Sequence, residues 1–183
     1  MTPEQHAVMA VAGLMALAAR TAPKGKGVDT IEIRVLAKKE LKALAAHLET
    51  LGTERQIGFF IRDAKNIAAS DACVIIGSRG DTVAGINCGG CGYPDCAGLE
   101  KVRKKRRSLN TPFDGPNCVI RMADLGIALG SAVKTAQIHN ADNRIMYSGG
   151  VAARDMGLVP KECTVVYAIP LAATWKNIFF DRS

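Results

Sequence analysis

The sequence predicts an α/β or α+β fold in which helices cover both faces of one sheet. Apolar patterns typical of strands alternate along the chain with patterns typical of helices. With 183 residues and 48% hydrophobic content, the chain can bury one full core but not two ordinary domains. No internal repeat or low-complexity linker divides the sequence. We therefore predict a single domain over residues 1–183.

Two helices and a strand are expected in the first third of the chain. Residues 4–20 are rich in Ala, Leu and Met, which are strong helix formers. Because nearly all of these positions are apolar, we expect this helix to be buried on most faces, in a core or a subunit interface. Residues 31–36 alternate apolar and polar side chains, as half-buried strands do. Residues 38–50 have the amphipathic pattern of a second helix, which Gly52 is placed to end.

The apolar start fits a buried helix better than a signal peptide. Its run from Ala7 to Ala19 follows Glu4, Gln5 and His6, whereas a signal peptide carries Lys or Arg before the apolar run. The sequence also lacks the run of about 18 apolar residues that a membrane helix needs. We therefore expect a cytoplasmic protein without membrane contact.

The middle of the chain continues the alternation. Residues 57–62 fit either a strand or a helix, and residues 62–69 fit a helix. Residues 72–77 (ACVIIG) form a short continuous apolar run, which indicates a strand buried on both faces.

The last third contains one long helical pattern and several short elements. Residues 119–138 predict a helix whose small side chains allow another helix or a cofactor to approach closely. Residues 144–148 and 164–170 predict strands, and residues 152–156 predict a short helix. Residues 175–182 are expected to be extended or to wrap a neighbouring chain.

Clustered cysteines indicate a metal or redox site, because structural disulfides are rare in a reducing cytoplasm. Three of the six cysteines form the pattern Cys88-x2-Cys91-x4-Cys96. Glycines lie between them and can adopt the positive φ that a tightly turning loop needs. Thiolates suit iron–sulfur clusters and zinc, but four-cysteine zinc sites usually contain two short-spaced pairs. The grouping of three cysteines plus one favours a 4Fe–4S cluster over 2Fe–2S or zinc.

Cys118 is the favoured fourth ligand. It follows a Gly-Pro turn and directly precedes an expected helix, whose N-terminus stabilises a thiolate. Cys73 lies within an apolar strand and is more simply a core residue. Cys163 precedes a strand and is more simply a spare thiol. Both remain alternatives at this stage.

A basic run, Lys101 to Arg107, follows the cysteine loop and carries much of the net charge of +7. Such charge should raise the reduction potential of a cluster and steer acidic partners of the ferredoxin or flavodoxin type. A solvated loop or helix face is the alternative interpretation. Aromatic residues do not alternate with the basic ones, so we expect no nucleic-acid binding.

Several segments resemble a family of uncharacterised ferredoxin-domain proteins from bacteria and archaea. The stretch INCGGCGYPDC (86–96) resembles that family's cluster-binding loop. Four further stretches resemble its other segments: RTAPKGKGVDTIEI (20–33), DLGIALGSAVKTAQ (124–137), YSGGVAARDMGL (147–158) and IPLAATWKNIFFDR (169–182). The family is in turn similar to nitroreductase-like flavoproteins, which are dimers with FMN at the subunit interface. The resemblance implies a nitroreductase-like sheet, a cluster-binding insertion at about 86–118, a homodimer and FMN.

The sequence departs from those flavoproteins in two places. It lacks the arginine-rich N-terminal element that grips the FMN phosphate, and it lacks an Asn-x-Gln-Pro-Trp stretch after the Ala-Pro loop. Arg20, Lys24, Lys26 and Arg182 are candidates to replace the lost phosphate contacts. Surface charge is the alternative role for each of them.

The function that the sequence favours is that of an iron–sulfur redox protein, in electron transfer or as a flavin-linked reductase. The alternative is a non-catalytic module in which the cluster is structural or senses redox state. That alternative draws on the absence of an evident catalytic acid, base or nucleophile: His6, His47 and His139 are scattered, and no P-loop or dinucleotide fingerprint is present.

Overall fold

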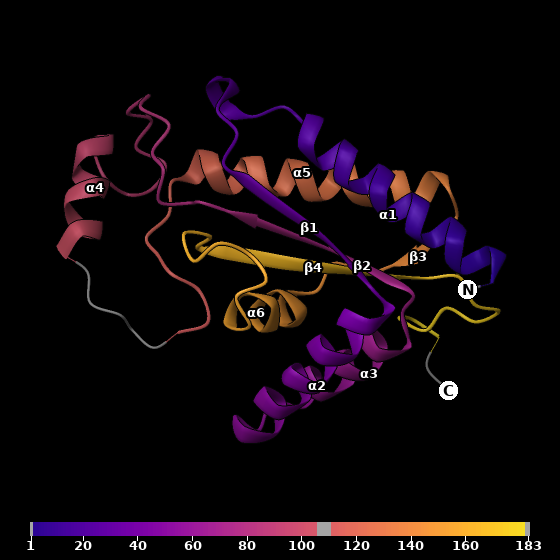
Figure 1. The fold of residues 1–183 in the computed structure, drawn as a ribbon. Coiled ribbons are helices and arrows are strands. Elements are labelled where there is room, and N and C mark those ends of the chain that lie inside the picture. The colour runs from indigo at the N-terminus through magenta and orange to yellow at the C-terminus, as the bar shows by residue number, and fades with distance from the viewer. Residues whose placement is uncertain (1, 106–110, 182–183) are drawn as a thin grey trace.

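The computed structural model describes residues 2–105 and 111–181 of the chain. These residues form a four-stranded antiparallel sheet with helices on both faces, as Figure 1 shows. The strand order is β1-β2-β4-β3, with β1 (Ile31–Ala37), β2 (Ala72–Ser78), β3 (Asp142–Asn143) and β4 (Val165–Ala172). The helices are α1 (Pro3–Thr21), the short 3-10 helix η1 (Gly25–Gly27), α2 (Lys38–Glu54), α3 (Gly58–Ala69), α4 (Cys96–Lys105), α5 (Val119–Ile138) and α6 (Tyr147–Asp155). The predicted fold class is confirmed.

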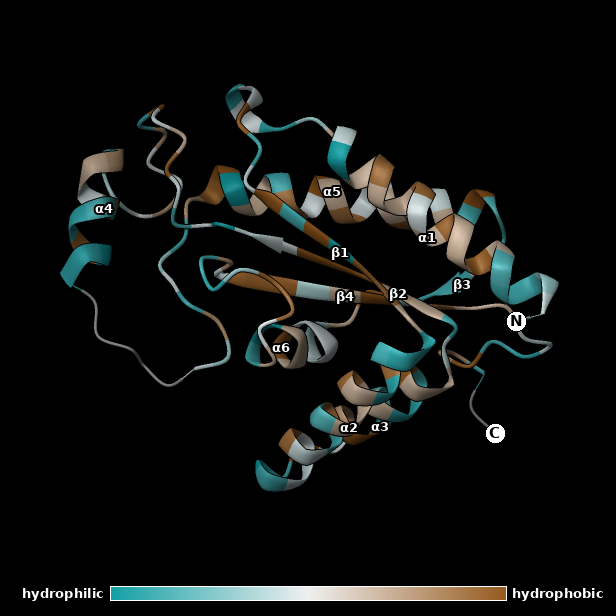
Figure 2. Cartoon of the chain, in the orientation of Figure 1, coloured by the Kyte–Doolittle hydropathy of each residue, from teal (hydrophilic) through white to brown (hydrophobic). Residues whose placement is uncertain are grey.

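The central strand β2 separates two apolar cores. All of its seven residues are buried, as its continuous apolar run predicted. Cys73 and Ile75 point into the core beneath α2, α3 and α6, whereas Val74 and Ile76 point into the core beneath α1 and α5. Figure 2 shows the strands as largely hydrophobic and the outer turns of the helices as more polar.

Helix α1 packs along α5 on one face of the sheet (Figure 1). Thr2 caps its N-terminus and forms a capping box with Gln5. One stripe of α1 is buried, but Leu14 and Leu17 are 42% and 59% exposed. The expected burial of α1 on most faces is therefore not found within a single chain.

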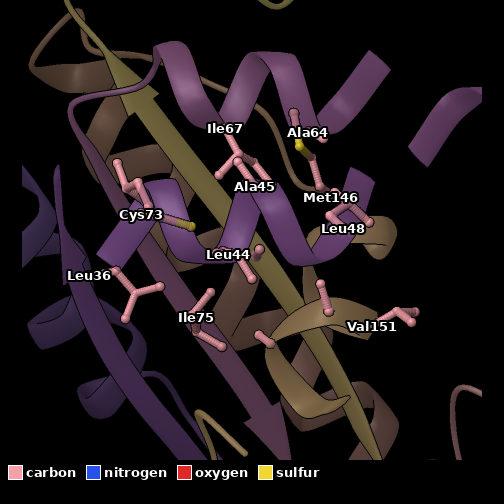
Figure 3. Packing of buried hydrophobic residues seen from close by; sticks show 14 of the residues in the cluster. Leu36, Leu44, Ala45, Leu48, Ala64, Ile67, Cys73, Ile75, Met146 and Val151 are labelled. Carbon is pink, nitrogen blue, oxygen red and sulfur yellow. The ribbon is translucent and has the colours of Figure 1, made fainter. Parts of the chain in front are cut away.

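The opposite layer contains α2, α3 and α6, whose apolar side chains interlock over the sheet in Figure 3. Gly52 does not end α2, contrary to expectation, because the helix continues to Glu54. Instead Gly52 lies where α3 passes closely: a Cβ there would be 2.9 Å from Phe60 Cβ. In the segment 57–62, which fitted either a strand or a helix, Ile57 is the N-cap and α3 begins at Gly58.

Two predictions near the C-terminus need correction. Residues 144–148 do not form a strand; only a single bridge joins Met146 to Ala168 among the described residues, and α6 begins at Tyr147. Gly150 lets the backbone of this helix lie directly against β4, a contact that the local pattern of residues 144–148 does not reveal. The tail is not extended over its described part, because Phe179 folds back and is 1% exposed in the core.

Within residues 2–105 and 111–181, no helix combines the length and the apolar character needed to cross a membrane.

Candidate metal centre

The cysteine loop is closed by the side chain of Asn87. Asn87 has a left-handed backbone (φ 48°), and its Oδ1 accepts a hydrogen bond from the backbone N–H of Cys96 at 2.9 Å. Between these ends, Gly89 and Gly92 have φ of 70° and 85°, and the N–H of Gly92 donates to the carbonyl of Gly89 at 2.9 Å. The loop thus makes the repeated tight turns for which its glycines were noted. Asn87 itself carried no recognised signal in the sequence.

Helix α4 begins at Cys96 and turns one face toward the start of α5. Cys96, Leu99 and Arg103 have the spacing of one helix face and are less exposed than their neighbours. Leu99 is 1% exposed and packs in a small apolar cluster with Cys118 and Ala84. Leu99 therefore links the helix that carries Cys96 to Cys118.

Cys118 is the N-cap residue of α5 and is 4% exposed. Its backbone N–H donates to the carbonyl of Gly80 at 2.8 Å. Neighbouring side chains approach position 80 closely, since a Cβ there would lie 2.6 Å from Asn117 Oδ1 and Thr164 Oγ1. Cys91 packs against the same apolar cluster as Cys118.

Cys88 reaches this region through Gly90. A Cβ on Gly90 would lie 2.7 Å from Val119 Cγ1 and 3.8 Å from Cys88 Sγ, so the loop rests against the first residue of α5. The four predicted ligands thus lie at one end of the molecule. Within the described ranges, however, no group of three or more Cys, His, Asp or Glu side chains is gathered as around a metal ion. The donor set suits an iron–sulfur cluster, and binding would require the loop thiols to turn inward.

Cys73 and Cys163 lie elsewhere. Both belong to the core beneath α2, α3 and α6, and Figure 3 shows Cys73 among Leu36, Leu44 and Ile67. Burial raises the pKa of the Cys163 thiol from 9.0 to about 11, with a smaller contribution from Glu32, and burial also raises the pKa of Cys73. Both thiols are thus kept protonated in the core, away from the cluster around Cys118.

The cations suggested for a flavin phosphate are largely used by the protein itself. Arg20 Nη1 lies 2.6 Å from Asp29 Oδ2 and donates to the carbonyl of Ile31 at 2.7 Å. Lys24 Nζ donates to the last carbonyls of α1, including that of Ala19 at 2.9 Å. Arg182 lies outside the described residues. Arg20 and Lys24 therefore fit an FMN phosphate poorly as they stand, whereas Lys26 is exposed.

A buried ion pair that sequence reasoning missed joins this basic loop to the cysteine end. Arg121 and Asp124 are 1% and 2% exposed, and Arg121 Nη1 lies 3.0 Å from Asp124 Oδ2. Arg121 donates to the carbonyls of Gly25 and Thr82, and Asp124 accepts from the N–H of Gly25 at 2.8 Å. The sequence did contain a signal for this buried ion pair: two opposite charges stand three residues apart in a helix of small apolar residues. Lys26, in the same basic loop, lies near Gly85 just before the cysteine loop: its Nζ would be 3.9 Å from a Cβ added at Gly85.

The basic run divides into two kinds of residue. Lys101, Lys104 and Lys105 are exposed on α4, whereas the side chain of Arg103 is 17% exposed and contacts the segment before Cys118. Arg106 and Arg107 lie outside the described residues.

A homologous protein supports the resemblance noted in the sequence. A protein of Archaeoglobus fulgidus, described as "Uncharacterized protein", is 42% identical over 182 residues, which cover 98% of this chain and 94% of that protein. The family described as "Uncharacterized protein containing a ferredoxin domain (DUF2148)" matches residues 114–182. That match includes Cys118 and begins after the cysteine loop. The ferredoxin domain in the description supports a redox role.

Solved nitroreductases have the same fold. Nitroreductase A from Vibrio parahaemolyticus is 10% identical with a TM-score of 0.55, covering 97% of this chain and 60% of that one. An FMN-dependent nitroreductase from Clostridium difficile is 15% identical with a TM-score of 0.54, covering 96% and 78%. This chain thus spans about three fifths of the length of the Vibrio enzyme. By its 42% identity to the Archaeoglobus protein and its match to the family, the chain belongs to the ferredoxin-domain family DUF2148, with a nitroreductase-like fold.

Proposed function

We propose that this chain is an iron–sulfur redox protein that binds a 4Fe–4S cluster through Cys88, Cys91, Cys96 and Cys118. The observation that carries the proposal is the packing of α4 on Cys118 through Leu99, which brings ligand segments from both sides of the basic run to one end of the molecule. In this view residues 86–118 form the cluster-binding insertion of a single nitroreductase-like domain. When bound, such a cluster supplies one-electron transfer.

The exposed face of α4 suits an acidic redox partner. Lys101, Lys104 and Lys105 are exposed on the helix that begins at Cys96. Positive charge beside a cluster favours its reduced, more negative state and speeds encounter with acidic proteins of the ferredoxin or flavodoxin type. The expected signature is an electron-transfer rate that falls with ionic strength.

The proposal is tested by the cofactor content of anaerobically prepared protein. Iron, sulfide, zinc and flavin are measured per chain in the wild type, in Cys91→Ser and in the matched control Cys163→Ser. We expect a wild type with iron and sulfide in equal amounts, loss of most iron in Cys91→Ser, and wild-type iron in Cys163→Ser, because Cys163 lies in the core. Zinc without iron in the wild type would refute the proposal.

The same measurement separates the finer versions of this function. Bound FMN would make the chain a flavin-linked reductase, and its absence would leave electron transfer by the cluster. A cluster whose loss unfolds the protein, and which exchanges no electrons with dithionite, would support a structural module instead. The fold of FMN-dependent nitroreductases favours measuring flavin, while the internal contacts of Arg20 and Lys24 weigh against a phosphate held by those two residues.

We also propose a homodimer in which α1 and α5 are at the interface. Both helices carry exposed apolar side chains, including Leu17 at 59% and Ile127 at 44% exposure. Apolar side chains gathered on adjacent helices are a common mark of a protein interface. A dimer would supply the burial that the sequence of residues 4–20 led us to expect.

A further inference from the structure

Arg103 contacts the segment before Cys118 although it belongs to the basic run of α4. Its guanidinium donates to the carbonyl of Pro116 and to Asn117 Oδ1, the latter at 3.5 Å. It also lies 3.7 Å from Asp81 Oδ2. With its side chain 17% exposed, Arg103 differs from Lys104 and Lys105, which are fully on the outside of the helix.

These contacts lie on both sides of the hydrogen bond that fixes Cys118. Asn117 directly precedes Cys118, and Asp81 directly follows Gly80, whose carbonyl accepts the N–H of Cys118. Arg103 therefore contacts both chain segments that meet at this hydrogen bond, the one with Gly80 and Asp81 and the one with Pro116 and Asn117. At Gly80 a Cβ would lie 2.6 Å from Asn117 Oδ1, so the segment that carries Gly80 packs closely against the residue before Cys118.

Arg103 also fixes the orientation of α4. Leu99 and Arg103 are four residues apart on one helix face and both contact the Cys118 region, Leu99 through apolar packing and Arg103 through polar contacts. Cys96, three residues before Leu99, lies on that same face. Two such contacts hold this face of α4 against the segment before Cys118 and so limit rotation of the helix that begins at Cys96.

We infer that Arg103 is a positioning residue that holds Cys96 and Cys118 in register for a common cluster; its metal-dependent part rests on the function proposed above. The planar guanidinium can reach several acceptors in different directions at once, whereas a lysine at this position offers a single ammonium. Partners that orient ligands from outside the coordination sphere typically change metal affinity by about 10- to 100-fold when removed.

The first test uses the full chain without iron and therefore does not depend on the cluster. The rate at which a thiol reagent modifies Cys118 is measured by mass spectrometry in the wild type, Arg103→Met, Arg103→Lys and the control Lys104→Met. Cys163 serves as an internal reference in every sample because it lies in the other core. We expect Arg103→Met to raise the Cys118 rate several-fold with Cys163 unchanged, because loss of its contacts eases local opening around Cys118, Arg103→Lys to have a smaller effect, and Lys104→Met to match the wild type.

The second test follows iron loss to a ferrous chelator after anaerobic loading of the same variants. We expect Arg103→Met to lose iron about 10-fold faster than the wild type and Lys104→Met to lose it at the wild-type rate. An equal effect of Arg103→Met and Lys104→Met would show that charge alone matters and would overturn the inference. So would unchanged Cys118 labelling and iron retention in a folded Arg103→Met.

The two proposals fail in different ways. A wild type that takes up no iron refutes the proposed function, and the labelling test of Arg103 still stands. If the wild type binds iron but Arg103→Met loses it no faster than the wild type, the inference is refuted and the proposed function stands. If Arg103→Met does not fold, Asp81→Ala removes the partner of this ion pair from the opposite side, and faster Cys118 labelling is again expected.

Discussion

At the scale of single residues, Asn87 decides whether the cysteine loop closes. Its side chain accepts the N–H of Cys96 while its own backbone is left-handed, a conformation that asparagine tolerates better than most residues. A residue adjacent to Cys88 is thereby tied to Cys96. The spacing of the cysteines indicates that they bind one metal site, and Asn87 supplies the contact that brings the loop ends together.

Two substitutions of Asn87 separate the hydrogen bond from the backbone conformation. Asn87→Ala loses the acceptor and strains the left-handed backbone, whereas Asn87→Gly loses the acceptor but suits that backbone. We expect both variants to release iron about 10-fold faster than the wild type, because both lack the bond to Cys96. The measurement is iron transfer to a ferrous chelator. Wild-type retention in Asn87→Gly would show that the conformation of the loop matters and the hydrogen bond does not.

The buried thiol of Cys163 predicts how stability depends on pH. Its pKa is raised to about 11 in the folded protein, so the folded state keeps a proton that the unfolded chain loses near its ordinary pKa of 9.0. The unfolded state then binds fewer protons, and this contribution to stability falls as the pH rises through that window.

Urea unfolding of the iron-free, reduced protein measures this effect. Between about pH 8 and about pH 10.5 we expect Cys163 to remove about 1–2 kcal/mol from the free energy of unfolding. Cys163→Ala should show a correspondingly weaker fall, whatever its stability at the lower pH. An identical pH dependence in the two proteins would contradict a protonated, buried Cys163.

At the scale of secondary structure elements, close contact between backbones fixes where helices lie on the sheet. Helix α6 begins at Tyr147, within the segment 144–148 predicted as a strand, and includes most of the predicted helix 152–156; Gly149 and Gly150 let it lie against β4. Periodicity within the segment could not reveal this contact, since the strand concerned lies some fifteen or more residues later in the chain, at Val165–Ala172. Gly52 serves the same purpose between α2 and α3.

Gly150→Ala tests the contact between α6 and β4. A Cβ at this position would lie 1.9 Å from the carbonyl oxygen of Val166, so the helix must move off the strand. We expect a loss of at least about 2 kcal/mol in the free energy of unfolding, measured in urea. The matched control is Gly58→Ala at the start of α3, where nothing lies within 4 Å of the added Cβ and stability should change little. A neutral Gly150→Ala would contradict the close packing of α6.

At the scale of the whole molecule, the two ends of the sheet differ in character. The basic loop at η1, the cysteine loop and α4 lie together at the end opposite the chain termini (Figure 1). Arg121 and Asp124 bind η1 and the segment before the cysteine loop through backbone groups of Gly25 and Thr82. Any electron acceptor bound near η1 would therefore lie at the same end as the proposed cluster.

The proposed dimer is tested by a charge on the outer face of α1. Leu17→Glu places a carboxylate on an apolar residue that is 59% exposed in the single chain, and a charge without a partner is costly to bury at an interface. We expect the mass in solution, measured by light scattering, to fall from about twice 19.4 kDa to that of one chain. Lys42→Glu on α2 is the control and should leave the dimer intact. A monomeric wild type would refute the proposal.

The sequence by itself determined the elements whose signals are local. Strands form at the predicted segments 31–36 and 72–77 and over residues 165–170 of the third, and residues 4–20 and 119–138 form helices, because side-chain periodicity and helix propensity act within one segment. The cysteine spacing and the glycines between the ligands likewise pointed to a candidate metal centre. Tertiary structure decided what depends on segments distant in the chain: the path of α6, the burial of Cys163, and the contacts of Arg103 and Arg121. Their partners lie far along the sequence or are backbone carbonyls, and such groups leave no pattern in the order of the residues.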